Sequence, residues 1–132
     1  MIKKISHLGM AVKDLGKSRE FYETVLGLKT SEPIVGGGGS IHVSMIQVGD
    51  VHIELLQPSG TEGVMAKFLE KHGEGFHHIC YEVDDIHAEI ERLKKEGMEI
   101  LGKVMDGVEG PSVFIHPRGT HGVLVELVEK RD

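Results

Sequence analysis

Short stretches of mainly apolar residues, separated by polar and glycine-containing segments, run along this 132-residue chain and predict a series of β-strands. The predicted strands cover residues 4–12, 28–35, 41–48, 51–56, 76–83, 99–104, 112–115 and 122–128. Apolar residues at helical spacing predict helices over 15–26, 64–71 and from 86 to the glycine at 97. Each half of the chain therefore has the element order β-α-β-β-β.

The two halves also share residues at equivalent positions. A shift of 71 positions places His7 on His78, Val12 on Val83 and Asp14 on Asp85. The closing strands match at a shift of 72, which places Glu54 on Glu126. This agreement predicts a duplicated module. We expect a single α+β domain, with module one over 1–58, a connection and short helix over 59–75, and module two over 76–132.

Composition narrows the functional classes. Hydrophobic residues make up 39% and charged residues 27% of the chain, as in ordinary globular proteins. The formal net charge of −6 and the lack of a basic stripe argue against nucleic acid as a partner. No apolar run approaches 18 residues, and residues 1–5 do not resemble a signal peptide, so we expect no membrane partner. The single cysteine, Cys80, is typical of a cytoplasmic protein.

The repeated residues His7, Glu54, His78 and Glu126 are the strongest candidates for chemistry. Glu126 lies on a predicted strand whose two faces are both largely apolar, and a buried carboxylate requires a partner. Two imidazole nitrogens and two carboxylate oxygens suit a divalent metal of borderline hardness. Tetrahedral zinc would be closed by four such ligands, whereas an octahedral ion would keep two open positions. The alternative is four unrelated residues, namely two core histidines, one solvated glutamate and one salt-bridged glutamate.

Two other segments are weaker candidates for a functional role. The run of four glycines at 36–39 lacks the lysine and helix of a phosphate-binding loop, so we expect a flexible flap or hinge. Arg118, in a turn after predicted strand 112–115, could bind an anionic ligand, or it could be an ordinary surface arginine.

Several motifs along nearly the whole chain resemble the vicinal oxygen chelate superfamily, which includes glyoxalase I and the extradiol dioxygenases. Within it, the sequence is most similar to the methylmalonyl-CoA epimerase family. The motifs that carry this resemblance are HLGMAV at 7–12, IELLQP at 53–58, AKFLEK at 66–71, GFHHI at 75–79, HPR at 116–118 and GVLVEL at 122–127.

The resemblance implies that the paired modules form a curved mixed sheet, a cup around one metal ion. The family's ligands fall on His7, Glu54, His78 and Glu126, and some epimerases carry glutamine at the position of Glu54. The implied metal is cobalt, with manganese, nickel or zinc as alternatives. The implied partners are an acyl-CoA substrate and a second copy of the chain in a homodimer.

The implied activity is that of a racemase or epimerase acting on acyl-CoA. A proton leaves C2 of the methylmalonyl group, giving a metal-stabilised enolate, and a proton returns to the opposite face. Glu126 matches one of the two catalytic carboxylates. The strand that carries the other one in the family has none here, so either His42 replaces it or the glycine loop admits a different substrate.

Three alternatives use the same scaffold. One is a glyoxalase I-like lyase, and another is an extradiol dioxygenase, although that enzyme class uses two histidines and one glutamate. The third is a non-catalytic member that binds small molecules, since one fold can host several functions.

Overall fold

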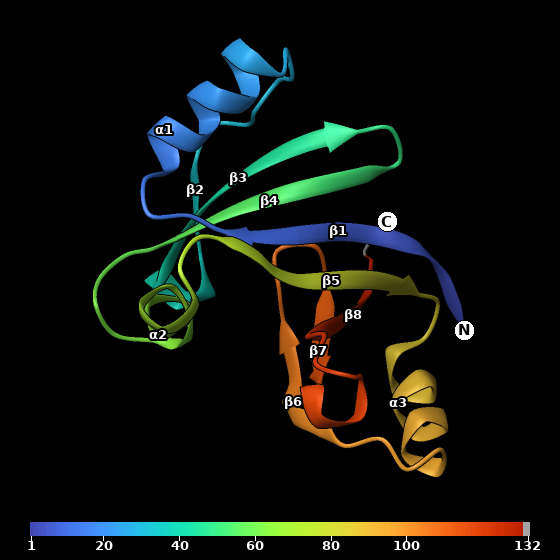
Figure 1. The fold of residues 1–132 in the computed structure, drawn as a ribbon. Coiled ribbons are helices and arrows are strands. Elements are labelled where there is room, and N and C mark those ends of the chain that lie inside the picture. The colour runs from blue at the N-terminus through green and yellow to red at the C-terminus, as the bar shows by residue number, and fades with distance from the viewer. Residues whose placement is uncertain (131–132) are drawn as a thin grey trace. The chain divides into compact units, whose positions relative to one another are not determined.

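The computed structural model describes residues 1–130, which form parts of two compact units. One unit spans His7–His77, and the other combines Met1–Ser6 with the chain from His78 onward. Each unit contains four strands of a mixed sheet and a helix that follows its first strand, as Figure 1 shows in blue to green and in yellow to red.

The His7–His77 unit has the expected β-α-β-β-β order. Its elements are β1 (Ile2–Ala11) from His7 onward, α1 (Leu15–Glu20), a π-helical turn (Phe21–Val25), β2 (Ile34–Gly36), a 3-10 turn (Gly37–Gly39), β3 (Ile41–Val48), β4 (Val51–Pro58) and α2 (Val64–His72). The strand order is β2-β3-β4-β1, in which β1 and β4 are parallel and the other pairs antiparallel.

Helices pack on both faces of this sheet. Because both faces are covered, its strands carry apolar residues on both sides. On one face, α2 contributes to a core made by Ala11, Val43, Leu56, Met65 and Leu69. On the other face, α1 contributes to a core made by Val12, Leu15, Ile46 and Leu55. The sheet of this unit therefore has an apolar core on each face.

The second unit repeats the order. Its elements are β5 (Gly75–Val83), α3 (Ile86–Lys95), β6 (Ile100–Asp106), β7 (Pro111–Ile115), a 3-10 turn (Pro117–Gly119) and β8 (Val125–Glu129). β5 is parallel to β8, and β6, β7 and β8 pair antiparallel. Helix α3 covers a core made by Val83, Ile86, Ile90, Val113, Ile115 and Leu127.

The duplication extends to the way each helix begins. Asp14 and Asp85 are the N-caps of α1 and α3, and each Oδ1 accepts a hydrogen bond of 3.0 Å from the backbone three residues on. The backbone N–H of the first helical residue also has a side-chain partner in both units. Leu15 N–H donates to Gln57 Oε1 (2.6 Å), and Ile86 N–H donates to Glu129 Oε1 (2.9 Å). The closing strand of each module thus binds the start of its own helix.

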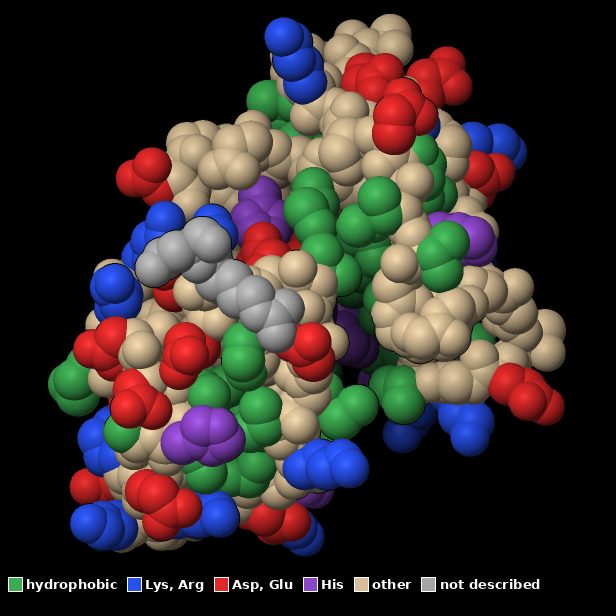
Figure 2. All heavy atoms as spheres, turned by 180° about the vertical axis from the view of Figure 1, so that it is seen from behind, with side chains coloured by type: hydrophobic (Ala, Val, Ile, Leu, Met, Phe, Trp, Pro, Cys, Tyr) green, Lys and Arg blue, Asp and Glu red, His purple; other side chains and the backbone are tan. Residues whose placement is uncertain are grey.

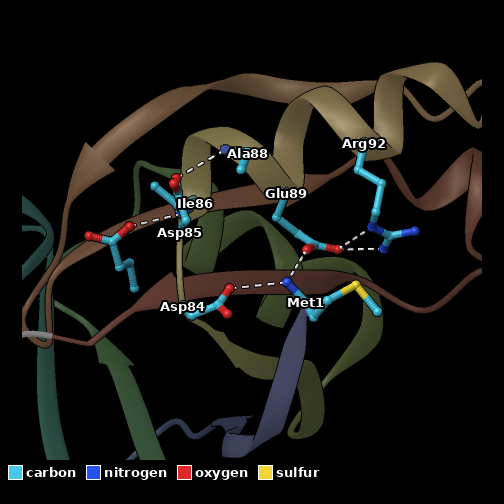
Figure 3. Close-up of polar contacts among 8 residues, drawn as sticks. Met1, Asp84, Asp85, Ile86, Ala88, Glu89 and Arg92 are labelled. Carbon is cyan, nitrogen blue, oxygen red and sulfur yellow. Dashed lines mark hydrogen bonds and ion pairs between the residues drawn. The ribbon is translucent and has the colours of Figure 1, made fainter.

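Two cationic groups contact a buried carboxylate on α3. Glu89 is 1% exposed; its Oε1 accepts from Arg92 Nε at 2.8 Å, and its Oε2 lies 2.7 Å from the Met1 ammonium group (Figure 3). The Arg92 guanidinium, followed by the Met1 ammonium, holds the pKa of Glu89 below its ordinary value of 4.5. The Glu89 and Asp84 carboxylates in turn raise the pKa of the Met1 amino group. Glu89 therefore connects α3 to Met1, the residue before β1.

Three local predictions differ from the structure. The helix predicted over 15–26 is α-helical only to Glu20 and continues as the π-helical turn. The strand predicted over 28–35 is reduced to β2, preceded by one isolated bridge between Thr30 and Ile46, because Pro33 interrupts the segment. The glycine run forms a short β-strand end and a 3-10 turn rather than an irregular loop, and Ser40 Oγ donates to the Gly37 carbonyl at 2.7 Å.

Charged side chains of both signs are interspersed on the surface seen in Figure 2. Within residues 1–130, no helix combines the length and the apolar character that crossing a membrane requires.

Candidate metal and catalytic site

The first half of the candidate site joins β1 and β4. The parallel register pairs His7 with His52 and Gly9 with Glu54, so these positions share one sheet face. His7 is 4% exposed, and its Nδ1 lies 3.5 Å from Oε2 of Glu54. The geometry of this unit thus brings His7 and Glu54 into contact.

His52 joins the same cluster, and sequence reasoning missed it. Its Nε2 lies 3.2 Å from Oε2 of Glu54, and its ring centroid is 5.0 Å from that of His7. His52 is 7% exposed, so its imidazole is nearly as buried as that of His7. The signal that could have identified it is its spacing of two from Glu54, which places both side chains on one strand face.

The second half of the candidate site joins β5 and β8. His78 is 4% exposed, and its Nε2 lies 3.1 Å from Oε1 of Glu126. The β7–β8 register places Phe114 opposite Glu126, and the Phe114 ring packs edge-on against His78 at 5.6 Å. An apolar wall thus limits water around this pair, which strengthens its electrostatic interaction.

Each unit therefore presents one buried histidine in contact with one glutamate, at positions related by the repeat. The donor atoms of His7, His52 and Glu54 all lie within 4.8 Å of one another. Imidazole nitrogens with carboxylate oxygens suit the divalent ions of the first transition row. The chemistry of these donors thus fits a divalent metal, and the cost of burying each carboxylate is offset by its imidazole partner.

His42 is not brought together with these residues. The β3–β4 register pairs Met45 with Glu54 and His42 with Gln57, with no bulge between them. Because strand side chains alternate, His42 lies on the α1 face, where Gln57 binds the start of α1, while Glu54 lies on the α2 face. This placement does not support His42 as the second base.

Arg118 is engaged at the surface. Its guanidinium forms an ion pair of 2.7 Å with Glu99, and both side chains are more than half exposed. This contact favours the surface interpretation of Arg118 over a role in anion binding.

Comparison with known proteins identifies the family. Residues 6–115 match the Glyoxalase/Bleomycin resistance protein/Dioxygenase superfamily. The chain belongs to this superfamily. The matched region includes three of the four repeat-related residues, His7, Glu54 and His78.

Several relatives with assigned names are epimerases. The chain is 39% identical to methylmalonyl-CoA epimerase, mitochondrial, of Bos taurus, over 94% of this chain and 73% of the relative. It is 40% identical to the ethylmalonyl-CoA/methylmalonyl-CoA epimerase of Cereibacter sphaeroides, over 96% of this chain and 98% of the relative. The predicted resemblance to the methylmalonyl-CoA epimerase family is confirmed.

A solved structure extends the similarity to the fold. A variant of Streptomyces coelicolor methylmalonyl-CoA epimerase in complex with 2-nitronate-propionyl-CoA has a TM-score of 0.92 and 30% sequence identity. The match covers 98% of this chain and 96% of the solved chain. The predicted α+β, glyoxalase-like fold class is confirmed.

Proposed function

We propose that this protein is an isomerase that epimerises methylmalonyl-CoA at C2 of its acyl group. The observation that carries the proposal is the presence of a buried histidine–glutamate pair in each module of a chain that is similar to methylmalonyl-CoA epimerases over nearly its full length. The named relatives and the acyl-CoA analogue held by the solved epimerase indicate an acyl-CoA substrate.

We further propose that His7, Glu54, His78 and Glu126 together hold one divalent metal ion, with cobalt as the first candidate and manganese, nickel or zinc as alternatives. The support is the donor chemistry of each pair, the burial of both histidines and the repeat relation between the pairs. When bound, such an ion supplies a Lewis acid that polarises substrate oxygens and so acidifies the C2–H.

Glu126 is the residue proposed to move the proton. Its carboxylate is oriented by His78 at 3.1 Å and is shielded by the Phe114 ring that packs on this imidazole. A carboxylate held in such an apolar setting can remove the C2 proton from its own face when one epimer is the substrate. When the other epimer is the substrate, the protonated group can donate a proton to that same face. His78 orients the carboxylate in both directions of the reaction.

We infer that the proton carrier on the other face of the substrate lies outside β3. The residues of β3 that share a face with Glu54 include Ile41, Val43 and Met45, and none of these can exchange a proton. We retain the alternative that the glycine-containing turn before β3 adapts this enzyme to a related acyl group. The relative named for both ethylmalonyl-CoA and methylmalonyl-CoA supports that possibility.

The domain organisation, the oligomeric state and the cellular location complete the proposal. The two modules, 1–58 and 76–132 with their 59–75 connection, act as one domain. The protein works as a homodimer in the cytoplasm. The support for these three statements is the family resemblance together with the single cysteine.

Epimerisation of one C2 epimer of methylmalonyl-CoA, followed by chiral analysis of the product, tests this function. We expect both epimers at equilibrium when the protein is loaded with Co²⁺. Retention of the starting configuration with Co²⁺, Mn²⁺, Ni²⁺ and Zn²⁺ alike would contradict the proposal.

A further inference from the structure

His52 has no place in the repeat and yet lies among the donor atoms of module one. The shift of 72 that relates Glu54 to Glu126 places His52 on Leu124, so module two has a leucine where module one has an imidazole. The extra histidine therefore makes the two modules chemically unequal. The duplication therefore does not explain why module one has a buried histidine at this position.

We propose that His52 is an additional metal ligand, which makes His7, His52 and Glu54 a three-donor set contained in one module. This inference rests on the proposed function only in requiring that a metal is bound. It differs from the four-residue set because it adds a donor that the repeat does not supply.

The spacing of the donor atoms supports direct ligation. Two donors about 2.1 Å from one ion are separated by about 3.0 Å at a right angle and about 3.4 Å at the tetrahedral angle. In the structure, Oε2 of Glu54 lies 3.2 Å from Nε2 of His52 and 3.5 Å from Nδ1 of His7. Both nitrogens thus approach the same carboxylate oxygen at separations that a shared ion would impose.

The strand geometry holds these atoms without distortion. His52 and Glu54 are two residues apart on β4 and share a face, and His7 is the cross-strand neighbour of His52 on β1. Gly9, the neighbour of Glu54, has no side chain that could occupy the space beside the carboxylate. Regular strands place donors more accurately than loops, so the set is preorganised.

Two imidazoles and one carboxylate would hold a divalent ion and would leave room for further ligands. With such a set in module one, metal affinity depends more on this module than on His78 and Glu126. Glu126 would then be freer to exchange a proton, because His7, His52 and Glu54 would hold the ion without it.

X-ray absorption spectroscopy of the Co²⁺-loaded protein tests the inference, because imidazole ligands give a multiple-scattering signature that can be counted. The proteins to compare are wild type, His52→Leu, His52→Gln and the control His87→Leu. The leucine variant copies module two, the glutamine variant keeps an amide donor toward Glu54, and His87 is an exposed histidine on α3.

We expect one fewer imidazole in both His52 variants than in wild type, a Co²⁺ affinity reduced at least about 10-fold, and no change in His87→Leu. An unchanged imidazole count in both His52 variants, with Co²⁺ bound, would overturn this inference alone and make His52 a residue that orients Glu54 from outside the coordination shell. Failure of the wild type to retain Co²⁺ would overturn the metal proposal as well.

Discussion

Oε1 of Glu126 lies 3.1 Å from Nε2 of His78, and in module one Oε2 of Glu54 lies 3.5 Å from Nδ1 of His7. The two glutamates occupy equivalent positions of a duplicated module, but the proposed chemistry gives them different tasks. Glu126 must exchange a proton with substrate, whereas Glu54 has to supply only an oxygen.

Paired glutamine substitutions separate these tasks. An amide cannot exchange the proton, so Glu126→Gln is expected to lower kcat by about 10²- to 10⁴-fold. Glu54→Gln keeps a carbonyl oxygen beside His7 and is expected to retain activity within about 10-fold of wild type. Steady-state epimerisation kinetics with bound metal quantified for each variant measure this difference. Equal losses in the two variants would contradict the division of roles.

Substitution of His42 tests the register argument. Because His42 lies on the α1 face of β3, opposite to Glu54, His42→Gln is expected to leave kcat within about 2-fold of wild type. Thermal unfolding measured in parallel controls for any loss of folded protein. A fall in kcat of about 100-fold in a stably folded variant would show that His42 does take part in proton transfer.

The Glu89 cluster predicts a pH dependence of stability. The folded-state pKa of Glu89 is lowered, chiefly by Arg92, so its contribution to stability is present above the ordinary value of 4.5 and is lost as the pH falls through the folded value. Wild type is therefore expected to lose more stability than Glu89→Gln as the pH falls below about 4.5. Thermal melts from pH 7 to pH 3 check this, with Glu91→Gln, an exposed carboxylate on the same helix, as control. Parallel melting curves for wild type and Glu89→Gln would refute it.

The glycine turn before β3 predicts unequal costs at neighbouring positions. Gly37 and Gly38 both have positive φ, but a Cβ at Gly37 would lie 2.5 Å from Ser40 Oγ, whereas a Cβ at Gly38 meets nothing within 4 Å. Gly38→Ala is expected to cost about 1 kcal/mol of backbone strain, and Gly37→Ala about 2–3 kcal/mol because it also displaces the Ser40 hydrogen bond. Urea unfolding measures both, and equal costs would contradict the observed turn.

Most residues of the candidate site could be proposed from the sequence, because duplication marks residues that local patterns leave ambiguous. His7, Glu54, His78 and Glu126 stand out as pairs, and the helix starts at Asp14 and Asp85 follow from capping preference. His52 could not be found in this way, since its counterpart is a leucine.

The role of His42 and the local structure around it depend on longer-range constraints. The face that His42 occupies follows from strand register, and a one-residue change of register would reverse it. The π-helical turn after Glu20 and the shortening of β2 likewise depend on tertiary packing and on Pro33, which outweigh local helical and strand patterns.

Exchange of the C2 proton of methylmalonyl-CoA with solvent tests the central claim most directly. The measurement is deuterium incorporation at C2 in D₂O, followed by mass spectrometry, with metal-free protein and with protein reloaded with Co²⁺. We predict exchange at the rate of epimerisation in the Co²⁺ protein, at least about 100-fold slower exchange in the metal-free protein, and recovery on reloading. Equally fast exchange without metal, or none with any divalent ion, would contradict the account.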